Sequence, residues 1–288
     1  MIGIQNDIWS VIYNRSFCAD NINTIESVGT FVITKLSIKE IKERLLHIYD
    51  ENDAFLLQCS QDERKGVQQA VASWKKSLEK QLQLENKWLE MNKYENEVLQ
   101  LGFKHIVGID EVGRGPLAGP VVAAAVILPR DLKLLGLDDS KKMTDSKKEQ
   151  MYEEIMASAI AVGVGIVSNE IIDKINIYEA TKVAMMEAVK QLSVAPDYAL
   201  IDAMKLPLVI QQQSIIKGDA NSVSIAAASV VAKVTRDRLM KEYDEQYPQY
   251  CFKKNMGYGT KEHLDALAEH GLTPWHRRSF APVKELIK

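Results

Sequence analysis

One stretch, residues 106–125, constrains this chain more than any other. An apolar run ends at two adjacent acids, Asp110 and Glu111, and a second apolar run leaves from Pro120. Between them lies a turn in which three glycines surround a single Arg114. Buried strands rarely carry paired acids, because isolated charges in an apolar interior cost too much free energy. Either the acids lie at a solvated strand end, or a positive group meets them there.

Length and composition are those of an ordinary globular protein. With 288 residues, 46% of them hydrophobic, and a net charge of −3, the chain can form one large domain or two modest ones. This balance argues against a polybasic binder, although a local basic face would suffice for nucleic acid. The three cysteines are scattered singly, there is no evident signal peptide, and no apolar run approaches the ~20 residues that span a bilayer. We therefore expect a soluble, cytoplasmic protein without membrane segments.

Residues 1–35 show no sustained hydrophobic period. We expect them to be disordered or a non-native extension, with translation starting near Leu36. The intact mass of the protein from its native source tests this start, because a mass that includes Met1 excludes it.

Residues 36–103 form a predicted helical N-terminal segment. Ser37 and Glu40 have the spacing of a capping box, and apolar residues then recur at helical intervals as far as Leu101. The segment either adds a surface for substrate or a partner, or packs on the main domain for stability. The sequence favours neither alternative.

From Lys104 onward, strand-like and helix-like runs alternate. The strand-like runs are 106–110, 121–128, 160–168, 198–202 and 208–216, and the helix-like runs are 146–159, 177–192, 221–247 and 261–269. The first two strands follow each other directly and are expected to be antiparallel, whereas the later strands, separated by helices, are expected to be parallel. The fold class predicted is α/β, a mixed five-stranded sheet flanked by helices, plus the N-terminal helical segment.

Four acids fall at or just after strand ends, and they are Asp110, Glu111, Asp202 and Asp219. Acids at the ends of neighbouring strands can converge, and a divalent cation relieves their mutual repulsion. Hard oxygen ligands suit Mg²⁺ or Mn²⁺, and two ions ~3.5–4 Å apart can activate a water and stabilise a leaving oxygen. Each acid alone is explained more simply as a turn former, a helix cap or a solvated strand end. All four together favour a metal site with one or two ions.

Further residues are candidates for binding a substrate. Glycines beside Arg114 let a backbone approach a ligand closely, so that its N–H groups could touch a phosphate or a ribose hydroxyl, although a tight turn is the simpler explanation. Several polar residues could contact phosphate, and they are Ser140, Lys141, Lys142, Lys233, Lys253, Lys254, Arg277 and Arg278. Tyr258 lies between glycines and could stack on a sugar or base.

Other chemistries find little support. There is no Gly-x-Ser-x-Gly elbow and no Walker-type loop. The five histidines lack metal-ligand spacing, and His263 and His270 are expected on a solvated helix face.

Residues 108–120 read Gly-Ile-Asp-Glu-Val-Gly-Arg-Gly-Pro-Leu-Ala-Gly-Pro, which resembles the signature of bacterial ribonuclease HII, the type 2 ribonucleases H. Further matches keep the family's order as far as the C-terminus, and they are Asp139-Ser-Lys141, Leu200-Ile-Asp202, Lys217-Gly-Asp219, the run from Ser224 to Lys233, and Gly257-Tyr-Gly259. The helical segment resembles the extension of some Gram-positive-type members.

The resemblance implies an RNase H-like fold with a catalytic domain over residues 104–288. The implied activity is endonucleolytic: hydrolysis of the RNA strand of RNA–DNA hybrids, and cutting 5′ of single ribonucleotides in duplex DNA, with metal-activated water leaving 3′-hydroxyl and 5′-phosphate ends. The implied metal-binding and catalytic residues are Asp110, Glu111, Asp202 and Asp219. The implied substrate-binding residues are Gly113, Arg114 and Gly115 for the 2′-hydroxyl, Tyr258 for the next deoxyribose, and Ser140, Lys141 and Lys233.

Two other functions fit these residues less well. A non-catalytic binding module on the same fold would be expected to lack at least one of the four carboxylates, and all four are present. A different RNase H-fold enzyme, such as an exonuclease or resolvase, is disfavoured by the Gly-Arg-Gly turn together with Tyr258. The chain is expected to act as a monomer, and a replication-associated protein partner is compatible with its sequence.

Overall fold

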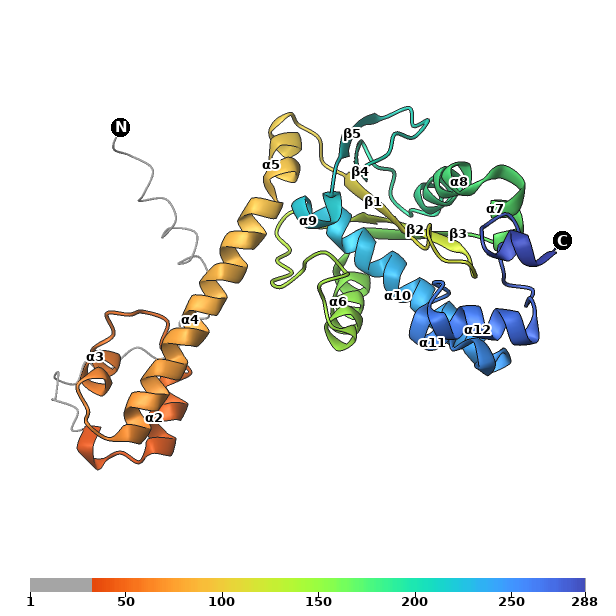
Figure 1. Ribbon diagram of the computed structural model, residues 1–288. Helices are drawn as coiled ribbons and strands as arrows, with labels where there is room; N and C mark the ends of the chain where they lie inside the picture. Colours follow the sequence, from red (N-terminus) through yellow and green to blue (C-terminus); the bar gives the residue numbers. More distant parts are fainter. Residues whose placement is uncertain (1–32, 288) are drawn as a thin grey trace. The chain divides into compact units, whose positions relative to one another are not determined.

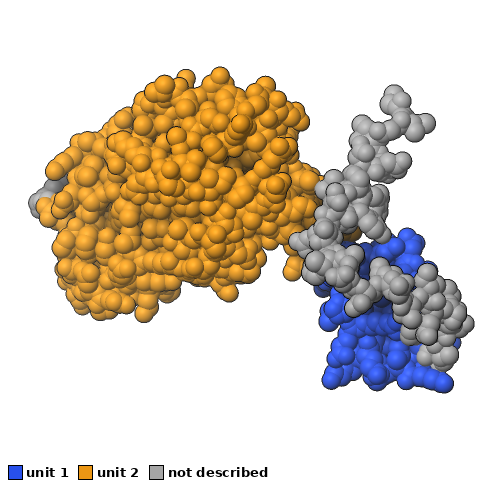
Figure 2. Space-filling view, turned by 180° about the vertical axis from the view of Figure 1, so that it is seen from behind, with its two compact units in different colours: residues 1–79 blue, residues 80–288 orange. Residues whose placement is uncertain are grey.

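The computed structural model describes residues 33–287, in which the chain forms two compact units that divide at Glu79 (Figure 2). The expectation for residues 1–35 falls on residues 1–32, outside the described part, except for one short 3-10 turn, η1 (Ile33–Lys35). The sequence-based boundary at residue 103 remains a prediction.

The first unit is helical. Its elements after η1 are α2 (Ile38–Leu45), α3 (Ala54–Ser60) and the start of α4 (Lys65–Met91). The predicted capping box is present, because the Ser37 side chain accepts from the Glu40 N–H while the Glu40 carboxylate accepts from the Ser37 N–H at 2.8 Å. Helix α3 has Asp53 as its N-cap, whose side chain accepts from the Phe55 and Leu56 N–H groups.

The second unit contains the rest of α4, helix α5 (Lys93–Gln100) and a five-stranded sheet of order β3-β2-β1-β4-β5. The strands are β1 (Ile106–Val112), β2 (Val121–Ile127), β3 (Ala161–Val167), β4 (Tyr198–Asp202) and β5 (Gln211–Ile215). Helices α6 (Asp145–Ser158) and α10 (Val223–Gln246) cover one face, and α7 (Asn169–Ile175) and α8 (Ile177–Lys190) cover the other (Figure 1). The predicted fold class is confirmed.

Strand directions match the prediction with one exception. Strand β1 is antiparallel to β2 and parallel to β4, and β4 is parallel to β5. Strand β3 was expected to be parallel but pairs antiparallel with β2. The reason is that α6 returns the chain to the end of β2, where the Ile160 N–H donates to the Ile127 carbonyl at 2.8 Å, so β3 begins where β2 ends. Helix α6 also begins one residue earlier than expected, at Asp145, with Thr144 as its N-cap.

Helix α10 lies unusually close to β1, and Gly108 is the reason. A Cβ added at Gly108 would lie 2.0 Å from the backbone carbonyl carbon of Ser224. The small residues of the first half of α10 are buried against the sheet. Side chains alternate between the faces of a strand, so Asp110, two residues after Gly108, also faces α10. This close packing places an acid under the helix.

The C-terminal region packs around the loop that follows β1. Its elements are α9 (Gly218–Asn221), which precedes α10, then η2 (Pro248–Tyr250), α11 (Phe252–Asn255), α12 (Lys261–His270) and η3 (Val283–Ile287). Leu117 and Ala118 share a buried cluster with residues of α10 and the elements after it. Among the described residues, no helix is long and apolar enough to cross a membrane.

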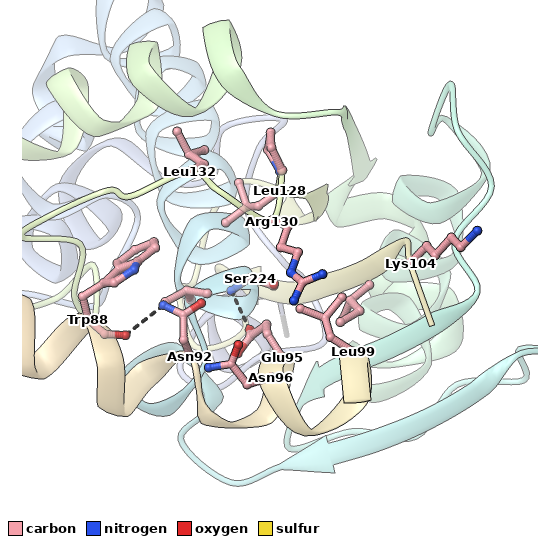
Figure 3. Close-up of a pocket in the computed structure, with 13 residues that line it drawn as sticks. Trp88, Asn92, Glu95, Asn96, Leu99, Lys104, Leu128, Arg130, Leu132 and Ser224 are labelled. Atoms are coloured by element: carbon pink, nitrogen blue, oxygen red, sulfur yellow. Dashed lines mark hydrogen bonds between the residues drawn. The ribbon is translucent and has the colours of Figure 1, made fainter. Parts of the chain in front are cut away.

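Helix α5 is anchored to the start of α10 by a buried carboxylate, Glu95. Its Oε1 accepts from the Ser222 hydroxyl at 2.5 Å and from the Ser224 N–H at 2.9 Å, beside a small pocket (Figure 3). Burial raises the pKa of Glu95. The carboxylate thus satisfies the Ser224 N–H, a donor that the first turn of a helix leaves unpaired.

We predict that Glu95→Ala lowers the free energy of unfolding by about 1–3 kcal/mol, since both buried donors would lose their acceptor. Urea unfolding monitored by circular dichroism measures this. The matched control is Asn96→Ala, an exposed neighbour on the same helix, for which little change is expected. Equal stability of the two variants would contradict the anchoring role.

Candidate active site

Three of the four predicted acids converge at one end of the sheet. Carboxylate oxygens of Asp110, Glu111 and Asp202 lie within 4.8 Å of one another. Asp110 and Glu111 are on β1, and Asp202 ends the neighbouring parallel strand β4. Parallel strands bring their carboxyl ends to the same edge, which is why acids far apart in the sequence meet here.

Asp110 is the most buried member of this cluster, with 3% of its surface exposed. Burial raises the pKa of Asp110 well above its usual value, and the charges of Glu111 and Asp202 raise it further. Hydrogen bonds from the Ser229 side chain and from the Glu111 N–H, at 2.7 Å, partly offset this effect. The site therefore holds negative charge at a cost that a cation would relieve.

Glu111 carries an unsatisfied oxygen. Its Oε1 contacts the Arg114 guanidinium at 3.2 Å, whereas its buried Oε2 has no hydrogen-bond partner among the described residues. Burial raises the pKa of Glu111, and Arg114 opposes that rise. A buried acceptor without a partner beside two other carboxylates fits a hard divalent cation.

Asp219 lies next to the cluster but outside the group of three. It is 6% exposed, and its Oδ2 pairs with Lys141 Nζ at 3.2 Å. Lys217 has a left-handed φ of 55°, and in the turn it begins the Gly218 N–H donates to Asp202 Oδ1 at 2.7 Å. Burial raises the pKa of Asp202, and the charge of Asp219 raises it further. Both acids therefore border the same edge of the sheet.

The Gly-Arg-Gly turn follows β1 directly. Gly113 has φ +90°, and a Cβ there would lie 2.3 Å from Arg236 Nε, so the position requires glycine. Arg277 donates to the carbonyls of Gly113 and Arg114. Arg277 was expected to contact phosphate, but it is completely buried and holds the turn from behind.

Tyr258 stands beside this turn. Its ring carbon Cε1 lies 3.5 Å from where a Cβ of Gly115 would be, and the residue is 48% exposed. The Leu117 N–H donates to the Gly257 carbonyl at 2.8 Å, which ties the two loops together. The structure thus brings Arg114, Gly115 and Tyr258 to one surface beside the carboxylates, whereas Gly113 is buried at the start of the turn.

The remaining predicted substrate-binding residues have partners within the protein. The Ser140 hydroxyl is buried 3.0 Å from that of Ser229, whose side chain also hydrogen-bonds Asp110. Lys141 extends from an 80% exposed side chain to Asp219. Lys233 pairs with Asp237 on α10 at 2.5 Å and is mostly buried. Ser140 and Lys141 therefore lie next to the acids. Lys233 would have to leave Asp237 in order to bind a phosphate.

Two histidines form a buried pair behind Tyr258, which the sequence did not reveal. His263 was expected on a solvated face but is completely buried, and its Nε2 lies 2.9 Å from Nε2 of His276. The Tyr258 carbonyl can only accept, so His263 Nδ1 donates to it; the Thr273 N–H can only donate, so His276 Nδ1 accepts from it. His276 Nε2–H then donates to His263 Nε2, and both rings are neutral.

This pair predicts a stability that depends on pH. Burial and the neighbouring His263 lower the pKa of His276 to about 4 from its ordinary 6.5. Between these values the unfolded chain binds the extra proton, so stability is present above pH ~6.5 and falls as the pH drops towards 4. Between pH 7 and pH 4.5, the free energy of unfolding of His276→Gln should fall by about 2–3 kcal/mol less than that of the wild type. Urea unfolding at each pH measures both proteins. Parallel pH profiles for the two proteins would contradict this.

Known proteins resemble this chain in sequence and in fold. A family model described as Ribonuclease HII matches residues 107–283. The chain belongs to the ribonuclease HII family. A second model, described as Ribonuclease HII N-terminal domain, matches residues 37–99. Ribonuclease HII of Bacillus anthracis is 57% identical over 254 residues, covering 88% of this chain and 99% of that protein. These matches show ribonuclease HII activity, and the chain is an endoribonuclease.

Solved structures show the same fold. Ribonuclease H2 from Pyrococcus horikoshii OT3 superposes with a TM-score of 0.54 at 24% identity, covering 64% of this chain and 97% of that one. RNase HII of Archaeoglobus fulgidus, solved in a complex with PCNA, gives a TM-score of 0.51 at 27% identity, covering 60% and 94%. Both structures therefore match about two thirds of this chain or less.

Proposed function

We propose that this chain cleaves the RNA strand of RNA–DNA hybrids and cuts on the 5′ side of single ribonucleotides embedded in duplex DNA. The observation that carries the proposal is the convergence of Asp110, Glu111 and Asp202 within 4.8 Å, at the strand end from which the Gly-Arg-Gly turn leaves. The carboxylates that would hold the metal therefore lie directly beside the turn that would contact the ribose. Membership of the ribonuclease HII family supports the same activity.

The donor set fits Mg²⁺ or Mn²⁺. Asp110, Glu111 and Asp202 would hold one or two such ions, with Asp219 at the border, and the unpartnered Glu111 Oε2 supplies a free ligand atom. A bound ion would activate the attacking water and neutralise charge on the leaving oxygen. The product ends would then be a 3′-hydroxyl and a 5′-phosphate.

The chain's own residues would position the substrate. Gly113, Arg114 and Gly115 would face the ribose 2′-hydroxyl, the group that distinguishes RNA from DNA. The exposed ring of Tyr258 would stack on the next deoxyribose. The exposed side chain of Lys141 pairs with Asp219 and would also contact a backbone phosphate of the substrate. The buried Ser140 lies next to it in the chain. Lys233 is the remaining proposed phosphate contact.

We also propose that the chain works as a cytoplasmic monomer and can bind a replication-associated protein. The complex of the Archaeoglobus relative with PCNA supports the second point. Light scattering of the purified protein tests the first, and a stable dimer would contradict it.

Cleavage of an RNA–DNA hybrid tests the proposed chemistry. With Mg²⁺ or Mn²⁺, the RNA fragments should end in a 3′-hydroxyl that a polymerase can extend, and a chelator should stop the reaction. RNA fragments ending in a 2′,3′-cyclic phosphate, or cleavage that persists in excess chelator, would contradict hydrolysis by metal-activated water.

A further inference from the structure

Two arginines are completely buried behind the Gly-Arg-Gly turn. Arg277 donates from Nη2 to the Gly113 carbonyl at 2.5 Å, from Nη1 to the Arg114 carbonyl at 2.9 Å and from Nε to the Gly119 carbonyl at 3.0 Å. Arg236 donates instead to the carbonyls of Pro120, Met256 and Ala118. Within residues 33–287, neither guanidinium has a carboxylate within 4.0 Å. Both are therefore buried charges held by peptide carbonyls.

Burial without an ion-pair partner is costly, so the arrangement needs a compensating role. Burial and the nearby Arg236 lower the pKa of Arg277 to about 9, so the guanidinium stays charged at neutral pH. A charged donor makes stronger hydrogen bonds than a neutral one. Arg277 therefore fixes the orientation of the peptide groups that it binds.

The fixed orientation decides where the opposite side of each peptide points. The Gly113 carbonyl and the Arg114 N–H belong to one trans peptide, as do the Arg114 carbonyl and the Gly115 N–H, and in a trans peptide the two groups point in opposite directions. With both carbonyls bound to buried Arg277, both N–H groups are directed away from it. In the described part of the chain, neither N–H donates to an acceptor.

We infer that Arg277 is a positioning residue for ribose recognition: it holds two consecutive carbonyls of the turn on the buried side and so presents the N–H groups of Arg114 and Gly115 to the 2′-hydroxyl. This inference rests on the proposed function, in which the turn faces the ribose. Arg236 binds neither of these two peptides and has no such role.

Binding selectivity tests the inference. Full-length protein carrying Asp110→Asn is used to prevent cleavage, and its Kd is measured for a duplex with one ribonucleotide and for an all-DNA duplex of the same sequence, with Mg²⁺ present. Arg277→Lys is then added, because an ammonium cannot hold three carbonyls in the fixed fork of a guanidinium. Arg130→Lys is the matched control, since Arg130 is exposed and is not among the residues proposed to bind substrate.

We expect Arg277→Lys to reduce the preference for the ribonucleotide duplex by about tenfold or more, with all-DNA binding little changed and the control unaffected. A merely structural role would weaken binding to both duplexes equally, and an unchanged or equally weakened pair of Kd values would overturn the inference. If Asp110→Asn alone shows no preference, the proposed function itself fails. A preference there that survives Arg277→Lys overturns the Arg277 role alone.

A second measurement covers the case in which Arg277→Lys does not fold. Amide hydrogen exchange on Asp110→Asn should show fast exchange at Arg114 and Gly115 in the free protein. The ribonucleotide duplex should slow that exchange, and the all-DNA duplex should slow it less. Slow exchange in the free protein, or equal protection by both duplexes, would overturn the presentation of these two N–H groups.

Discussion

Asp110→Asn is expected to abolish cleavage while leaving substrate binding largely intact. The amide has the shape of the carboxylate but lacks its charge, so the buried centre of the three-carboxylate cluster would lose an anionic ligand. Loss of a residue that only hydrogen-bonds a metal ligand lowers activity by up to about 100-fold. Loss of a ligand itself should lower kcat by more than that. Single-turnover cleavage of a labelled hybrid measures the rate, and fluorescence anisotropy measures binding.

The same substitution should not destabilise the protein in the presence of a chelator. Burial and like charges raise the pKa of Asp110, so its replacement by a neutral group removes repulsion from the folded state. Asp131→Asn, an exposed acid after β2, is the matched control and should keep full activity. Substantial turnover by Asp110→Asn would contradict a catalytic role for Asp110.

Gly108→Val is expected to destabilise the protein strongly. The new Cβ would lie 2.0 Å from the Ser224 carbonyl carbon and 2.4 Å from the Ile225 nitrogen, both in the backbone of α10. Neither atom can move without displacing the helix from the sheet. We expect the free energy of unfolding to fall by about 3 kcal/mol or more, at the upper end of overpacking costs. Activity should fall as well, because Asp110 lies on the same face of β1.

Gly115→Ala is the matched control for stability. Its Cβ would lie 3.5 Å from the Tyr258 ring, an ordinary contact. The expected change in unfolding free energy is within about 0.5 kcal/mol. Urea unfolding of both variants compares them, and equal losses would show that α10 does not depend on close approach at Gly108.

Local patterns were sufficient to predict much of this molecule. Short strand-like apolar runs located the strands, and helical spacing located the longer helices. The positions of Asp110, Glu111 and Asp202 at strand ends were enough to predict that they converge. The structure adds that Asp219 borders this cluster with Lys141 as its partner. The roles of the four acids and of the substrate-binding residues remain predictions.

What the sequence could not show depends on contacts across the fold. Arg277 and His263 looked like surface residues because charge and helical spacing are local signals. Arg277 is in fact buried against the loop after β1, and His263 is buried against aromatic rings of the C-terminal region. Arg277 binds carbonyls 158 to 164 residues away. The antiparallel direction of β3 was missed for a related reason, since a helix between two strands does not state to which end it returns the chain.

The most direct test of the central proposal uses a DNA duplex that carries one ribonucleotide, with Mg²⁺ or Mn²⁺ and an all-DNA duplex as the control. The carboxylate cluster beside the Gly-Arg-Gly turn predicts a single cut on the 5′ side of the ribonucleotide and no cut in the all-DNA duplex. No cleavage with either metal, or equal cleavage of both duplexes, would contradict the proposal.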